Sequence, residues 1–168
     1  MPLGAEIMVR MGELAVSKAA GDVLVTIGLG SCIGLALVDR RRSLAGLAHV
    51  MLPSASDGKT SSPAKFADQA VPALTDRLRK LGAAPSQLEA VLVGGAQMFA
   101  LNGGSGLDIG GRNERAVRDA LATIGIPVRA AETGGSSGRT IRVHVNTGTV
   151  LAKAAGGREV ELLAGIRA

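Results

Sequence analysis

The chain of 168 residues contains a single cysteine, Cys32. One thiol excludes an internal disulfide, and one ligand cannot hold a structural metal ion. Two reasons for the cysteine then remain, packing in the core or chemical reactivity. Packing is a serious alternative, because free cysteine is among the most buried residue types and behaves as a small hydrophobe.

Tryptophan and tyrosine are absent, and Phe66 and Phe99 are the only aromatic residues. The core must therefore consist of closely packed aliphatic and alanine side chains beside many glycines. The same scarcity argues against nucleic-acid binding, because the scattered basic residues have no stacking aromatics among them and no nucleic-acid-binding motif is present. The formal net charge of +5 instead favours a basic face that meets an acidic protein partner.

Long hydrophobic segments are also missing. The longest apolar run, Val23 to Val38, is too short and too often interrupted by glycine to span a bilayer. Met1 to Lys18 contain no apolar stretch typical of a signal peptide. We therefore expect a cytoplasmic protein without membrane insertion. A chain of this length is typical of one domain, which we expect to cover residues 1–168.

The neighbours of Cys32 favour reactivity over packing. Gly28, Gly30 and Gly34 bracket the thiol between two apolar runs. Glycine inside a strand weakens it unless the backbone must bend sharply or allow a close approach, and a thiol at such a bend can be presented to a substrate. The segment nearly matches the dinucleotide-binding fingerprint, but Ile33 occupies the third glycine position and a strand is expected to follow. No cofactor and no metal site is predicted.

His49 lies in the next apolar run, Leu44 to Pro53, which is typical of a half-buried strand ended by proline. A histidine in this setting is more often a core or edge residue than a catalytic one. The polar stretch 39–43, however, suits the turn of an antiparallel hairpin. If residues 33–38 pair back on residues 44–51, Cys32 and His49 fall at the same end of that hairpin. The sequence therefore predicts that the thiol and the imidazole meet.

A histidine within hydrogen-bond reach would take the thiol proton and lower the thiol pKa from its usual value near 8.5. Thr26 precedes Cys32 on the adjoining strand. Its hydroxyl or its carbonyl could accept a hydrogen bond from the imidazole N–H and fix the tautomer of His49. The alternative is that Thr26 is a β-branched residue that favours a strand and has no further role.

Hydrophobic periodicity predicts more strands than helices, which is typical of an α+β fold with antiparallel sheet. Helices are expected at 63–81 and 112–124. Strands are expected at 6–18, 23–28, 33–38, 44–52, 88–93, 128–132, 140–145 and 149–152.

Several motifs follow one another along nearly the whole chain. They are Thr26, the Gly-Ser-Cys of 30–32, the Ala-His-Val-Met-Leu-Pro of 48–53, the Gly-Gly-Ala-Gln-Met-Phe of 94–99, the Ile-Gly-Gly-Arg-Asn of 109–113 and the Gly-Gly-Ser-Ser-Gly-Arg of 134–139. This ordered set resembles the CheD family of chemoreceptor glutamine deamidases. Two positions depart from the family pattern, with Glu132-Thr133 where an aspartate is more usual and Lys65-Phe66 where a tyrosine is common. Both departures lie away from Cys32, His49 and Thr26. They therefore put contacts with partner proteins in question before they put the reaction in question.

The resemblance implies two packed, mostly antiparallel β-sheets flanked by helices (α/β/β/α), similar to the catalytic domain of cytotoxic necrotizing factor. It implies a protein-glutamine glutaminase that converts glutamine side chains of methyl-accepting chemotaxis proteins to glutamate and ammonia through a cysteine thioester. Cys32 would be the nucleophile, His49 the acid and base, and Thr26 the residue that orients His49. Ser31 and the Cys32 N–H would bind the oxyanion. The implied partners are the cytoplasmic domains of chemoreceptors and the phosphatase CheC.

Two other functions stay open at this point. One is a non-catalytic adaptor that acts on receptors or on CheC by docking. The other is a receptor methylesterase, because the same thioester would form from a methyl ester.

Overall fold

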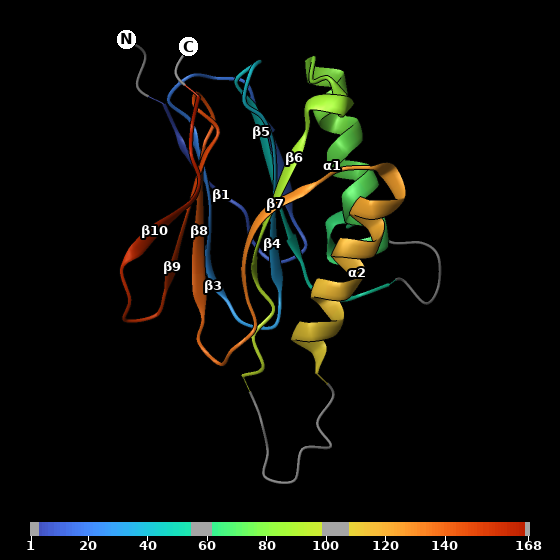
Figure 1. Cartoon of the computed structure of the whole chain (residues 1–168), viewed down its shortest axis with the longest axis vertical. Helices are drawn as coiled ribbons and strands as arrows, with labels where there is room; N and C mark the ends of the chain where they lie inside the picture. Colours follow the sequence, from blue (N-terminus) through green and yellow to red (C-terminus); the bar gives the residue numbers. More distant parts are fainter. Residues whose placement is uncertain (1–3, 55–61, 99–107, 167–168) are drawn as a thin grey trace, which may run out of the picture.

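The computed structural model describes residues 4–54, 62–98 and 108–166. Within these ranges the chain forms ten β-strands in two five-stranded sheets, together with two α-helices and two short 3₁₀ helices. The two sheets pack face to face, and the α-helices cover the outer face of one of them (Figure 1). The expected α+β class with two packed sheets is confirmed.

The first sheet has the strand order β1-β3-β8-β9-β10. β1 lies parallel to β3, and the other neighbouring strands are antiparallel. The strands are β1 (Glu6–Met8), β3 (Val23–Leu29), β8 (Arg139–His144), β9 (Thr149–Ala154) and β10 (Glu159–Leu163).

The second sheet has the order β2-β5-β4-β6-β7. Within the described part of this sheet, β6 and β7 are the one parallel pair, and the α-helix between these two strands makes the crossover. The strands are β2 (Leu14–Ser17), β4 (Ile33–Asp39), β5 (Leu44–Val50), β6 (Glu89–Gly94) and β7 (Val128–Thr133).

The central strand β4 supplies side chains to two separate cores. All seven of its residues are buried. Ile33, Leu35 and Leu37 pack beneath the helices, whereas Ala36 and Val38 pack against the first sheet. Because side chains of a strand alternate between its two faces, a continuous apolar run fills both layers at once.

The helical segments follow β5 and β6. They are η1 (Pro63–Lys65), α1 (Ala67–Leu81), η2 (Pro85–Gln87) and α2 (Ile109–Ile124). α1 buries Ala70, Leu74 and Leu78 at helical spacing. At the start of α2 the Asp108 side chain accepts a hydrogen bond of 2.9 Å from the Gly111 N–H, which caps the helix.

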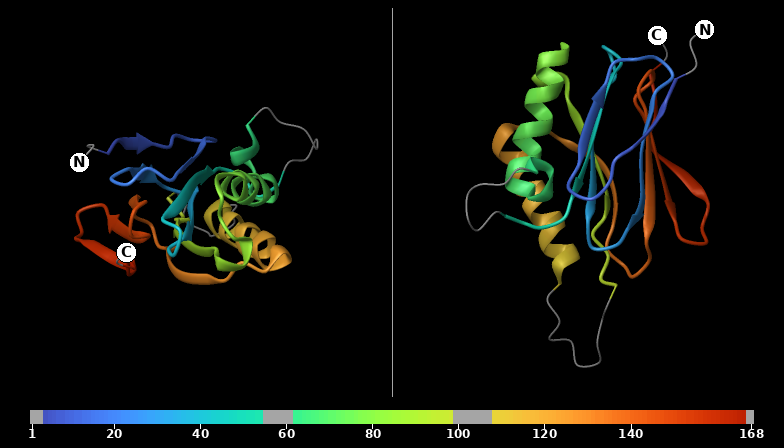
Figure 2. Two further views of the ribbon diagram at one scale, coloured as in Figure 1. Left: turned by 90° about the horizontal axis from the view of Figure 1, so that it is seen from above. Right: turned by 180° about the vertical axis from the view of Figure 1, so that it is seen from behind.

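Both α-helices lie on the same side of the molecule (Figure 2). Their strand contacts are to β2, β4, β5 and β7 of the second sheet. In the described residues the layers therefore run helices, sheet, sheet, which corrects the expectation of helices on both outer faces. The open face of the first sheet carries charged side chains. On β8, Arg142 lies between the buried Ile141 and Val143 and pairs with Glu6 and Glu159, so this face tolerates solvent.

Several elements differ from expectation, and α2 begins at Ile109, three residues before the expected start. The strand expected at 6–18 is two strands, β1 and β2, in different sheets, because Gly12 turns the chain between them with φ of 77°. The helix expected at 63–81 is interrupted at Phe66, whose backbone is extended. β10 was not among the expected strands, and it pairs antiparallel with β9.

Candidate active site

The β4–β5 hairpin places Cys32 and His49 at the same end. Its register pairs Gly34 with His49 and Ile33 with Val50, so Cys32 precedes the first paired residue of β4. Cys32 and Gly34 lie two positions apart and share a face, and His49 lies on that same face. The predicted antiparallel hairpin is confirmed.

The shared face points toward the first sheet. A Cβ built on Gly34 would lie 2.9 Å from Leu29 Cδ1 and 3.0 Å from Ile141 Cγ2, both of which belong to the first sheet. Cys32 packs against the same inter-sheet core. Because position 34 has no side chain, no side chain of β4 stands directly opposite the imidazole, and Leu29 and Ile141 pack closely over this part of the strand.

His49 is held by a backbone carbonyl. The residue is only 5% exposed, and its Nδ1 lies 3.3 Å from the Val9 carbonyl oxygen. A carbonyl only accepts hydrogen bonds, so the proton sits on Nδ1 and the lone pair remains on Nε2. Burial lowers the pKa of His49, although the Val9 bond and the Glu13 charge oppose this. The ring is therefore a neutral base with a fixed tautomer.

Thr26 reaches the same carbonyl. Its hydroxyl donates a hydrogen bond of 2.7 Å to Val9 O, and the residue is fully buried. Thr26 is thus joined to His49 through the Val9 carbonyl, which accepts from both side chains. Sequence reasoning expected Thr26 itself to accept the imidazole hydrogen bond, whereas His49 Nδ1 bonds to Val9 O and the Thr26 hydroxyl donates to that same carbonyl. The sequence gave no signal for Val9, because a backbone carbonyl leaves no trace in residue type.

Burial raises the pKa of the Cys32 thiol. This direction is opposite to the lowering expected from a neighbouring histidine. An imidazolium would lower the thiol pKa, but the buried imidazole is itself held neutral. The resting pair is therefore a thiol and an imidazole, and proton transfer belongs to the attack on substrate.

Three consecutive carbonyls around the thiol are fixed by hydrogen bonds. Gly30 O accepts from Ala96 N, Cys32 O accepts from Gly95 N, and Ser31 O accepts from the side-chain amide of Asn113, each at 2.9 Å. Ser31, the predicted oxyanion residue, is half-buried in the bend between β3 and β4. The backbone of the nucleophile is thus held from the segment that directly follows β6 and from α2.

The glycine pairs allow this close packing. Gly94 has φ of 114°, and a Cβ there would overlap the Cys32 carbonyl oxygen. Gly134 N donates to Gly94 O, and Arg139 Nη1 donates to Gly134 O at 2.7 Å and to Gly94 O at 3.2 Å. The motifs at 94–96, 109–113 and 134–139 therefore meet around one backbone segment. Phe99, in the first of these motifs, lies outside the described residues.

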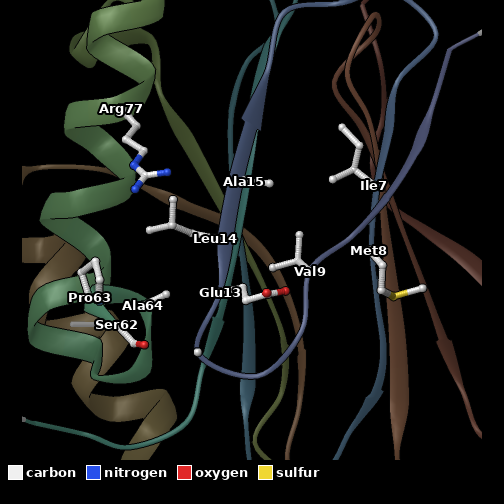
Figure 3. Close-up of a pocket in the computed structure, with 11 residues that line it drawn as sticks. Ile7, Met8, Val9, Glu13, Leu14, Ala15, Ser62, Pro63, Ala64 and Arg77 are labelled. Carbon is white, nitrogen blue, oxygen red and sulfur yellow. The ribbon is translucent and has the colours of Figure 1, made fainter. Parts of the chain in front are cut away.

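A cavity of about 380 Å³ is lined in part by Val9, the residue whose carbonyl contacts His49. Val9 and Glu13 line it from the strand side, and Ala64 and Arg77 line it from the helical side (Figure 3). Val9, whose carbonyl accepts from Thr26 and His49, thus also lines this cavity. In the described ranges no group of three or more His, Cys, Asp and Glu side chains is arranged to hold a metal ion.

Comparison with known proteins shows the family of this chain. Residues 51–154 match the model of the family described as CheD chemotactic sensory transduction. The chain belongs to the CheD family. A probable chemoreceptor glutamine deamidase CheD of Archaeoglobus fulgidus is 44% identical over 158 residues, which cover 94% of this chain and 99% of that protein. A probable chemoreceptor glutamine deamidase CheD of Clostridium botulinum strain Hall is 43% identical over 90% of this chain and 94% of that protein.

Among solved structures, the hypothetical protein YfiH of Bacillus licheniformis aligns at a TM-score of 0.45 and 15% identity, over 73% of this chain and 49% of that chain. Glu132-Thr133 stand where the CheD resemblance led us to expect an aspartate. The Glu132 Oε2 atom lies 3.6 Å from Arg139 Nε. No helix in the described parts of the chain is long and apolar enough to cross a membrane.

Proposed function

We propose that this protein deamidates glutamine side chains of chemoreceptors, with Cys32 as nucleophile and His49 as general base and acid. The observation that carries the proposal is the register of the β4–β5 hairpin, which sets the only thiol of the chain and a tautomer-fixed imidazole on one face. Membership of the CheD family and the printed names of the relatives supply the substrate class.

The reaction follows from the neutral resting pair. His49 Nε2 takes the thiol proton while the sulfur attacks the glutamine amide carbon, and a C–S bond forms. The developing oxyanion is bound by the Cys32 N–H and by Ser31. His49 then gives its proton to the departing nitrogen, ammonia leaves, and a thioester remains. Water, activated by His49, hydrolyses the thioester to glutamate and restores the thiol.

Thr26 acts in this scheme as a positioning residue. Its hydroxyl supports the Val9 carbonyl that holds the imidazole, so it contacts neither the substrate nor the sulfur. None of these steps requires a metal or an organic cofactor, because amide hydrolysis by thiol and imidazole uses only these groups and water.

The partners are part of the same proposal. The substrates are the cytoplasmic domains of chemoreceptors, and a CheC-like phosphatase is the expected regulator by the family resemblance. A basic surface beside the site suits an acidic partner. Arg112 and Arg115 are exposed on the first turns of α2, on either side of the buried Asn113 that holds Ser31. The cytoplasmic location predicted from the sequence stays a prediction.

The test is incubation of the protein with a receptor cytoplasmic fragment, followed by peptide mapping in a mass spectrometer and measurement of released ammonia. The expected result is conversion of specific glutamines to glutamate. Loss of the methyl group from a receptor methyl ester would instead identify a methylesterase, and binding without any mass change would identify an adaptor.

Variants connect the activity to the site. Cys32→Ala and His49→Ala should abolish turnover while the far-ultraviolet circular dichroism stays that of the wild type. His144→Ala is the matched control, because His144 is the only other histidine and lies on β8 with no part in the proposed chemistry. Retained ammonia release in Cys32→Ala would refute the proposed nucleophile.

A further inference from the structure

Asn113 is an unusual residue for its place in the fold. It is 0% exposed and stands on the face of α2 that also buries Gly110, Val117 and Leu121. Its side-chain oxygen Oδ1 has no hydrogen-bond partner among the described residues. A buried polar atom without a partner destabilises a fold, and an aliphatic residue here would avoid that loss. The amide nitrogen must therefore perform a task that an aliphatic side chain cannot.

The amide nitrogen joins the two strands of the active-site hairpin. Nδ2 donates one hydrogen to Ser31 O and the other to Met51 O, each at 2.9 Å. Ser31 directly precedes Cys32, and Met51 follows His49 by two residues. The last backbone pair of the hairpin is Ile33 with Val50, so Asn113 continues the ladder just beyond its end. Both acceptors are carbonyl oxygens, which fixes the orientation of the amide.

The bond to Ser31 O also determines where the Cys32 N–H points. A peptide unit is planar and trans, so its C=O and its N–H point in opposite directions. Ser31 O and the Cys32 N–H belong to one peptide unit. Because the carbonyl is drawn toward α2, the N–H is directed away from the helices, toward the face that carries the thiol and the imidazole. Hydrogen bonding at the carbonyl further polarises the unit and strengthens the N–H as a donor.

We propose that Asn113 is a positioning residue that aims the Cys32 N–H at the oxyanion of the reaction and holds the strand end after His49 at a fixed distance from it. This inference rests on the proposed function, because it assigns Asn113 a part in the same reaction. Asn113 acts through the Ser31–Cys32 peptide unit and contacts no reacting atom.

The experiment compares Asn113→Ala with Val117→Ala, which shortens a fully buried side chain one turn further along the same face of α2. Loss of an aimed oxyanion donor should lower kcat for deamidation roughly 10- to 100-fold with KM nearly unchanged. Alkylation of Cys32 by iodoacetamide, which forms no oxyanion, should keep its wild-type rate and pH profile. Val117→Ala should keep the wild-type kcat even if its Tm falls as much as the Tm of Asn113→Ala.

Two results would overturn the assignment. One is a loss of kcat in Asn113→Ala no larger than in Val117→Ala. The other is an equal fall of kcat and of the alkylation rate, which would mean that Asn113 holds the thiol and not the donor. Should Asn113→Ala not fold, Asn113→Ser takes its place, since a hydroxyl can donate to one carbonyl and should give an intermediate kcat.

A measurement independent of turnover separates this inference from the proposed function. Should the wild-type protein release no ammonia from any receptor fragment, the proposed function fails. Hydrogen exchange of the backbone amides at 31–33 then tests by itself whether Asn113 holds the Ser31–Cys32 peptide unit in place. Faster exchange in Asn113→Ala than in Val117→Ala supports it, and equal exchange in the two variants overturns it.

Discussion

The shared Val9 carbonyl makes Thr26→Val the most informative substitution in this protein. Valine matches the shape of threonine and favours a strand, so the substitution removes one buried hydrogen bond and little else. Such a bond contributes about 0.5–1.5 kcal/mol to stability. For a chain of this size, that loss corresponds to a fall in Tm of about 1–6 °C.

The effect on catalysis should be similar in size, because His49 keeps its own bond to Val9 O. If the full hydrogen-bond energy is lost from the positioning of the imidazole, kcat falls roughly two- to tenfold. Thr26→Ser keeps the hydroxyl and should retain nearly wild-type kcat. Its Tm should still fall, because a buried methyl group is lost.

The assay is ammonia release from a receptor fragment, measured together with Tm for both variants. A loss of more than about 100-fold in Thr26→Val, with Tm unchanged, would mean that the hydroxyl contacts the imidazole or the substrate directly. Unchanged kcat in Thr26→Val would mean that the Val9 carbonyl needs no second donor. Either result refutes the relay from Thr26 through Val9 to His49.

Three further predictions follow from the same structure. Glu13→Gln removes the charge that raises the pKa of His49, so that pKa should fall and the acid limb of the profile of kcat/KM against pH should move to lower pH. Glu89 is buried, which by itself raises its pKa, but its bonds to Arg40 and Arg129 lower it overall from 4.5. Its stabilising contribution should therefore be complete above pH 4.5 and lost as the pH falls below it. In Glu89→Gln, urea unfolding at neutral pH should show a loss of about 1–3 kcal/mol. Gly28→Ala, where φ is 75° and no atom lies within 4 Å, should cost about 1 kcal/mol, whereas Gly94→Ala should cost at least about 3 kcal/mol and most of the activity. Equal losses in these two variants would show that the overlap with the Cys32 carbonyl is relieved.

The neutral Cys32 thiol and His49 imidazole affect how the protein reacts with its substrate and with other reagents. A thiol whose pKa is raised by burial is a poor target for adventitious oxidation or alkylation, because the thiolate is the reactive form. A substrate that brings an amide carbon to the sulfur and its oxygen to the Cys32 N–H favours proton transfer to His49 at that moment. The protein is thus expected to react slowly with general thiol reagents at neutral pH.

Much of the site could be predicted from local patterns. Two apolar runs, the polar turn between them and a proline stop predicted the β4–β5 hairpin, and the structure contains it with Gly34 paired to His49. The nearness of Cys32 and His49 is a consequence of that register. The glycines beside Cys32 likewise predicted a bend that the structure contains.

The tertiary structure alone decided the rest. Val9 acts through its carbonyl and Asn113 through a contact with residues 82 and 62 positions away in sequence, and neither relation appears in any local pattern. The direction of the thiol pKa also depends on burial, which a neighbouring histidine in the sequence does not reveal. Residue type and periodicity thus determined which side chains could react. The packing of α2 and of the first sheet against the hairpin decided how their backbone and protons are held, because hydrogen bonds between distant segments form only once the layers have assembled.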